Sequence, residues 1–174
     1  MPIKVAVYLA DGTISGWLAR PAPLREALEG VGGLPLERAA WRALDGSSTE
    51  DVGSVTISAD DVLLAIGDDE PATAVHATWH HVNVASGPWA LEGDLPTMPG
   101  FDPGRALTRP SGEFVLLRDV RISLRDRPGL ELARGDHAFV NRYAVERIRA
   151  ELMLGFFFPG AVVEEVMGGV GIRP

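Results

Sequence analysis

Apolar and polar residues alternate over several short stretches of this chain, and the pattern returns in its second half. Residues 3–9 alternate Ile, Val, Val and Leu with Lys, Ala and Tyr. This alternation is typical of a β-strand with one buried face. Segments 5–7 and 14–18 reappear 77 residues later as segments 82–84 and 91–95, with similar apolar residues in the same order. The recurrence indicates two copies of one supersecondary unit.

A second recurrence supports the duplication. Residues 57–62 match residues 140–145 at an offset of 83. Gly16 and Gly93 stand at corresponding places in the middle of predicted strands. Glycine weakens a strand unless the backbone bends there or approaches another strand closely. We therefore predict equivalent bends at these two glycines.

Together these patterns predict an all-β fold. We expect two tandem five-stranded small barrels of the SH3-like or Sm-like type, with short helical insertions and an apolar C-terminal tail. Leu24 and Leu28, followed by a glycine-rich segment, predict one short helix. The expected boundaries are a first barrel, a linker, a second barrel and the tail, at residues 1–66, 67–75, 76–150 and 151–174.

The strand motifs resemble those of the Sm-like family. In that family an apolar strand ending in Asp-Gly leads to a Gly-x-Leu strand, and a later pair of strands is joined by a tight turn. Residues 7–12, 16–18 and 57–66 are similar to this layout, and residues 93–95 and 140–148 are similar to a second copy. The resemblance implies a small barrel for most of residues 3–150.

Family members bind RNA, but their RNA-pocket residues are not matched here. Ala22 stands at the Asp position, and Arg25-Glu26 replace the Met-Asn pair. In the second copy, Pro99 and residues 102–103 depart from the same pattern. The chain also carries a net charge of -8, whereas phosphate binding requires a positive field. We therefore expect no nucleic-acid partner.

Arginines gather in one part of this acidic chain. Residues 105–149 hold ten arginines and six acidic residues. Guanidinium groups bind carboxylates and phosphates through paired donors. The segment therefore yields the candidate ligand-binding residues, for a small anionic ligand: Arg118, Arg121, Arg125, Arg127, Asn141 and Arg142.

Three histidines in residues 76–81 form the nearest approach to a metal motif. His76 and His80 share one face of a strand or a helix, and imidazole is a good zinc ligand. His80 is in phase with the apolar positions 82 and 84, so we expect it to be a hydrogen-bonded core residue instead. The third-ligand candidates are Asp68, Asp69, Glu70 and His137. Because nothing fixes their geometry, we predict no metal and no cofactor.

The tail contains three consecutive rings, Phe156, Phe157 and Phe158. One short element buries at most two of them against its own domain, and a ring left in water favours a partner surface. A helix over residues 161–167 would align Val162 with Val166. The tail then either fills the cleft between the barrels or forms a subunit interface. These five residues are the predicted interface of a homo-oligomer.

The functional expectation is a non-enzymatic binding or assembly module for an unknown protein or a small anionic ligand. The chain has no cysteine and no G-x-S-x-G motif. Two alternatives stay open: a small metal-dependent or anion-handling enzyme, and an RNA-binding Sm-like protein. No targeting segment is visible, and every apolar run is shorter than the about 20 residues that cross a bilayer. We therefore expect a cytoplasmic protein without membrane contact.

Overall fold

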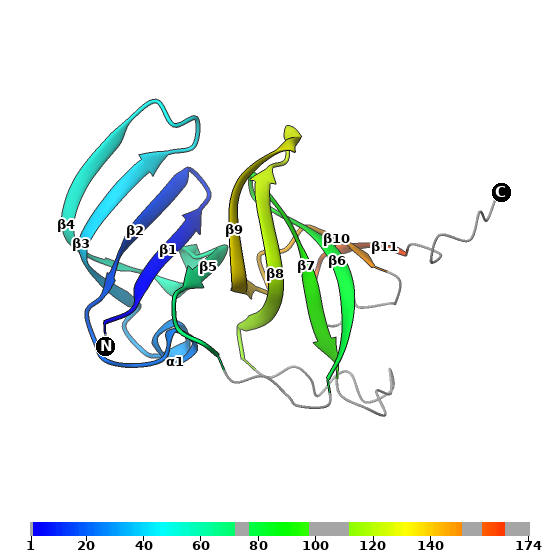
Figure 1. The fold of residues 1–174 in the computed structure, drawn as a ribbon, viewed down its shortest axis with the longest axis horizontal. Helices are drawn as coiled ribbons and strands as arrows, with labels where there is room; N and C mark the ends of the chain where they lie inside the picture. Colours follow the sequence, from blue (N-terminus) through cyan, green and yellow to red (C-terminus); the bar gives the residue numbers. More distant parts are fainter. Residues whose placement is uncertain (1, 72–76, 98–111, 151–157, 166–174) are drawn as a thin grey trace.

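The computed structural model describes residues 2–71, 77–97, 112–150 and 158–165. These residues form eleven strands in one sheet, in the order β11-β10-β6-β7-β8-β9-β5-β1-β2-β3-β4 (Figure 1). The predicted all-β class is therefore confirmed. The sheet is open, with β4 at one edge and β11 at the other.

The two halves of the chain contribute consecutive blocks of strands. The first half forms β1 (Lys4–Leu9), β2 (Gly12–Leu18), β3 (Leu34–Ala43), β4 (Thr49–Ile57) and β5 (Leu64–Gly67), with a 3-10 turn η1 (Ala59–Asp61) before β5. The second half forms β6 (Thr78–Ser86), β7 (Trp89–Thr97), β8 (Phe114–Leu124), β9 (Arg127–Asn141), β10 (Arg147–Ala150) and β11 (Val162–Glu165).

The predicted short helix is α1 (Leu24–Glu29), between β2 and β3. Its Leu24, Ala27 and Leu28 are buried, so the helix covers one end of the first-half core. No helix among the described residues is long and apolar enough to cross a membrane.

One strand order occurs in both halves. The first half is ordered β5-β1-β2-β3-β4, and the second half is ordered β10-β6-β7-β8-β9. The pairing of β2 with β3 shifts register between Ser15 and Trp17, and that of β7 with β8 shifts between Glu92 and Asp94. The irregularity thus lies at corresponding places in the two halves.

Close backbone approach explains the glycine at each irregularity. A Cβ on Gly16 would lie 3.0 Å from the carbonyl oxygen of Glu37, and one on Gly93 would lie 3.1 Å from that of Arg118. The residues after these carbonyls, Arg38 and Asp119, have positive φ angles of 51° and 52°.

The halves join through β5 and β9. Leu64 pairs with Val140 and Ala65 with Phe139, while β5 also pairs with β1. The backbone N–H of Asn141 extends this junction by donating to the Leu63 carbonyl over 2.9 Å. One continuous sheet therefore passes from one half into the other.

The two hydrophobic cores also exchange residues. Tyr8 and Leu64 of the first half lie in the core of the second half. Phe114, Leu116 and Phe139 of the second half lie in the core of the first. Because burial of such a side chain stabilises a fold by about 1.5–3 kcal/mol, the halves depend on one another.

The described part of the tail is a strand, so the predicted helix over residues 161–167 is wrong. β11 runs parallel to β10, with Arg147 opposite Val162 and Ala150 opposite Glu165. The N–H of Val162 donates to the carbonyl of Glu146 over 2.7 Å. Pairing with the otherwise open edge of β10 thus overrides the helical spacing of the apolar residues.

Candidate functional site

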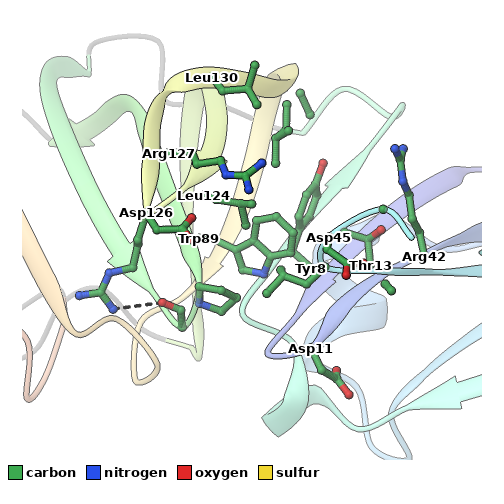
Figure 2. Close-up of a pocket in the computed structure, with 18 of the residues that line it drawn as sticks. Tyr8, Asp11, Thr13, Arg42, Asp45, Trp89, Leu124, Asp126, Arg127 and Leu130 are labelled. Carbon is green, nitrogen blue, oxygen red and sulfur yellow. Dashed lines mark hydrogen bonds between the residues drawn. The ribbon is translucent and has the colours of Figure 1, made fainter. Parts of the chain in front are cut away.

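A cleft of about 910 Å³ lies where the two halves face each other. Four connections surround it: the β1–β2 and β3–β4 turns from the first half, and the β6–β7 and β8–β9 turns from the second (Figure 2). Residues far apart in the sequence therefore form a single concave surface.

Two aromatic side chains form the floor of the cleft. Tyr8 and Trp89 meet edge to face, with ring centroids 5.0 Å apart and ring planes at 89°. The Trp89 indole N–H donates to the Leu9 carbonyl over 2.7 Å. Burial raises the pKa of the Tyr8 hydroxyl above 10.0. The two rings are thus in contact and the indole is tied to β1, and the Tyr8 hydroxyl stays protonated at neutral pH.

Leucines line part of the cleft wall, mainly on the second-half side. Leu44 lines the first-half side, and Leu124, Leu130 and Leu132 line the second-half side. Leu130 and Leu132 are 51% and 47% exposed, although they are large apolar residues. Their exposure leaves apolar surface available to a partner molecule.

Charged groups of both signs stand around the rim. Arg127 extends from β9 toward the Trp89 indole, whereas Arg42 on the opposite wall points away from it (Figure 2). Asp11, Asp45 and Asp126 are also at the rim. Hydrogen bonds from the side chain and backbone of Ser47 lower the pKa of Asp45, which keeps this carboxylate ionised.

Two of the six sequence-predicted ligand residues, Arg125 and Arg127, lie at this cleft. Arg125 donates to the Gly87 carbonyl over 3.0 Å and is paired with Glu146. Arg127 forms no ion pair with any described residue. Of the two, Arg127 therefore has the more available guanidinium.

Arg121 lies elsewhere, in a groove of about 310 Å³ formed by β6 to β10. Arg147 and Arg149 share this groove, and both pair with Glu164 of β11, at 2.9 and 3.5 Å. Glu92 also lines it. Because acidic side chains compensate these arginines, the groove is less suited to a small anion.

Arg118 is separate from both concave surfaces. Its guanidinium stacks on the Trp79 ring at 3.7 Å, and its Nε lies 3.9 Å from Asp94. This cation–π contact, favourable by about 0.5–2 kcal/mol, gives Arg118 a structural role on the face of the sheet.

Asn141 and Arg142 are buried structural residues. The Asn141 side-chain amide donates to the Val62 carbonyl over 3.1 Å, next to the β5–β9 junction. Arg142 donates to the Gly112 carbonyl over 3.1 Å. The predicted set of six is therefore not brought together: Arg125 and Arg127 share one site, and the other four residues lie apart from them.

The histidines do not meet in a metal-binding arrangement. His76 lies outside the described residues. His80 is half-buried and its Nε2 lies 2.7 Å from the Thr97 hydroxyl, which agrees with a hydrogen-bonded position. His81 instead contacts Glu92 and Asp94, at 3.1 and 3.2 Å.

Two of the third-ligand candidates, Asp68 and Asp69, are hydrogen-bonded to backbone N–H groups of the first half. Asp68 accepts from the backbone N–H of Lys4 over 3.0 Å, and Asp69 accepts from that of Leu24 over 3.1 Å. Both carboxylates thus fix the chain after β5. Within the described ranges, no group of three His, Cys, Asp or Glu side chains is placed to hold a metal ion.

The predicted interface residues divide between the core and the surface. Phe158 is fully buried in the second-half core, so this ring packs within its own chain and not at a subunit interface. Val162 is 55% exposed on β11. Phe156, Phe157 and Val166 lie outside the described residues. Homo-oligomerisation remains a prediction.

Sequence reasoning missed the residues that form the cleft. Tyr8 stood with Lys4 and Ala6 on the strand face opposite the apolar residues, and nothing in the sequence marked Trp89 as a binding residue. The apolar pair at positions 130 and 132 was a usable signal, because it alternates with Glu131 in a segment that is otherwise polar. Only the fold reveals that these residues face the first half.

Comparison of the chain with protein-family models, curated proteins and solved structures finds no match.

Proposed function

We propose that this protein is a non-enzymatic binding module built from two fused Sm-like units, and that the cleft between its halves is the binding site. The repeated strand order and the paired irregularities at Gly16 and Gly93 support the two-unit interpretation. The observation that carries the binding proposal is the cleft of about 910 Å³, with its aromatic floor and exposed leucine wall.

The composition of the cleft suits recognition of a partly apolar ligand. Binding sites are concave, mostly apolar and oriented by a few polar groups. Leu130 and Leu132 supply apolar surface, while Arg127 supplies donors for an anionic group. The opposed acidic residues Asp11 and Asp126 at the rim limit the attraction for a highly charged polyanion.

A fluorescent probe tests whether the cleft binds ligands. The dye 1-anilinonaphthalene-8-sulfonate combines aromatic rings with one negative charge, and its emission rises in apolar surroundings. Thr13 lines the cleft from β2, where it pairs with Tyr8 of the floor, so Thr13→Trp places a bulky ring in the cleft and obstructs it. Val31 is 97% exposed and outside the cleft, so Val31→Trp is a matched control.

We expect the wild-type chain and Val31→Trp to bind the dye equally, and Thr13→Trp to bind it at least tenfold more weakly. Near-ultraviolet circular dichroism verifies that all three proteins are folded. If Thr13→Trp binds the dye as well as the wild type does, the cleft is not the binding site.

A further inference from the structure

β9 is much longer than the strand that covers its outer side. On one side it pairs with β8 from Arg127 to Asn141. On the other side only Phe139 and Val140 pair with β5. Figure 1 shows the β8–β9 hairpin continuing beyond β5. Among the described strands, none pairs with this side of residues 127–137.

The uncovered part of β9 has two distinct faces. Leu130, Leu132 and Ala133 line the cleft, whereas Gly129 and Glu131 line the groove on the opposite side. Leu130 and Leu132 are therefore neighbours on the cleft side, two residues apart, as in any strand. Both are about half exposed.

Building on the binding function proposed above, we infer that the free edge of β9 over residues 129–135 pairs with an extended peptide of a partner protein. The peptide adds a strand to the sheet beside β9, and its alternate apolar side chains enter the cleft next to Leu130 and Leu132. The site is thus a strand-addition site, in which backbone groups give affinity and side-chain positions give specificity.

The unpaired backbone groups of β9 favour an extended peptide as the partner. An unpaired strand edge presents N–H and C=O groups that a further strand satisfies. The same edge of β9 already accepts β5 at Phe139 and Val140, so the peptide would extend an existing junction. Pro128 has no N–H, so pairing begins at Gly129. Seven residues then provide about 23 Å of strand.

The experiment starts from peptides of unbiased sequence. A phage-displayed library of random dodecapeptides is selected on the full-length wild-type chain, and the enriched peptides are then tested on the double variant Leu130→Asp/Leu132→Asp. Both leucines are about half exposed, so the variant should fold, as circular dichroism verifies. Val31→Asp is the matched control, because Val31 is an exposed apolar residue outside the cleft.

The binding of enriched peptides is measured by fluorescence anisotropy. We expect peptides with apolar residues at alternate positions to bind the wild type and Val31→Asp equally, and the double variant at least tenfold more weakly. N-methylation of alternate peptide nitrogens on one edge should abolish binding, while methylation of the intervening nitrogens should leave it intact. Bound peptide should also slow hydrogen exchange in residues 129–135.

The possible outcomes separate this inference from the proposed binding function. Peptides that require Leu130 and Leu132 but tolerate methylation at every nitrogen occupy the cleft without strand pairing, which overturns the inference alone. Failure to enrich any peptide, while the dye still binds in the cleft, also overturns the inference alone. Peptides that bind the double variant normally, together with normal dye binding by Thr13→Trp, overturn both.

Discussion

Tyr8 of β1 and Trp89 of β7 pack edge to face across the boundary between the two halves, with ring centroids 5.0 Å apart. Tyr8 belongs to the hydrophobic core of the second half. The Trp89 indole donates to the Leu9 carbonyl of the first half. This pair therefore joins the halves and also forms the floor of the cleft.

Replacing Trp89 by phenylalanine should destabilise the whole chain. The variant removes the indole donor from the part-buried Leu9 carbonyl, which costs about 0.5–1.5 kcal/mol. Urea unfolding followed by circular dichroism measures the loss. Tyr8→Phe is the control, because the Tyr8 hydroxyl has no hydrogen-bond partner among the described residues, and it should cost less. Equal losses in the two variants would contradict a special role for the indole hydrogen bond.

The raised pKa of Tyr8 gives the protein a specific sensitivity to alkali. Because burial favours the neutral hydroxyl in the folded state, this group binds its proton more tightly there than in the unfolded chain. Its contribution to stability is complete below about pH 10 and is lost as the pH rises through the folded-state pKa. Urea midpoints between pH 8 and 11 should fall less steeply for Tyr8→Phe. Parallel curves would show that Tyr8 does not couple to folding.

Alanine at Gly16 or Gly93 should destabilise the protein by a similar amount, about 1–3 kcal/mol, because each added Cβ meets a backbone carbonyl and must displace it. Thermal unfolding of the two single variants measures the effect. Gly129→Ala is the control, since a Cβ there meets no atom within 4 Å. A marked cost at Gly16 but none at Gly93 would contradict the equivalence of the two irregularities.

The features predictable from the sequence were those set by local periodicity. Leu24 and Leu28 identified the helix, and the alternation in residues 3–9 identified β1. The first ten residues of β9 were not predicted as a strand. They are mostly exposed on both faces, so no period-two burial pattern marks them.

Features set by long-range pairing were not predictable in the same way. Val162 and its neighbours satisfy both a helical and a strand pattern, and only the open edge of β10 decides between them. Likewise, no sequence signal placed Arg127 near Trp89 while directing Arg118 onto Trp79. The arginines formed one group in the sequence, but strand alternation and sheet bending distribute them over different surfaces.

Removal of β11 should promote self-association. β11 pairs with β10 along its whole length, and without it β10 becomes an uncovered edge in addition to β4. A chain ending at Pro159 keeps Phe158 in its core and loses the strand. Light scattering at equal concentration should give this truncated chain a larger mass than the full-length chain.

A control variant shows whether loss of the strand, and not of one side chain, causes any change in mass. Val162→Ser, which changes an exposed side chain and keeps the strand, should leave the mass unchanged. A lower mass for the truncated chain would instead show that the tail itself joins subunits, as the sequence alone suggested.

The most direct test of the account is a map of backbone amide shifts on binding. ¹H–¹⁵N correlation spectra of the full-length chain are recorded with and without a peptide enriched as described above. We predict shifts at Thr13, at residues 42–47 and at residues 129–135, which line the cleft or the free edge of β9. Shifts confined to the groove around Arg121, Arg147 and Arg149 would place the binding site on the other face of the sheet and contradict the account.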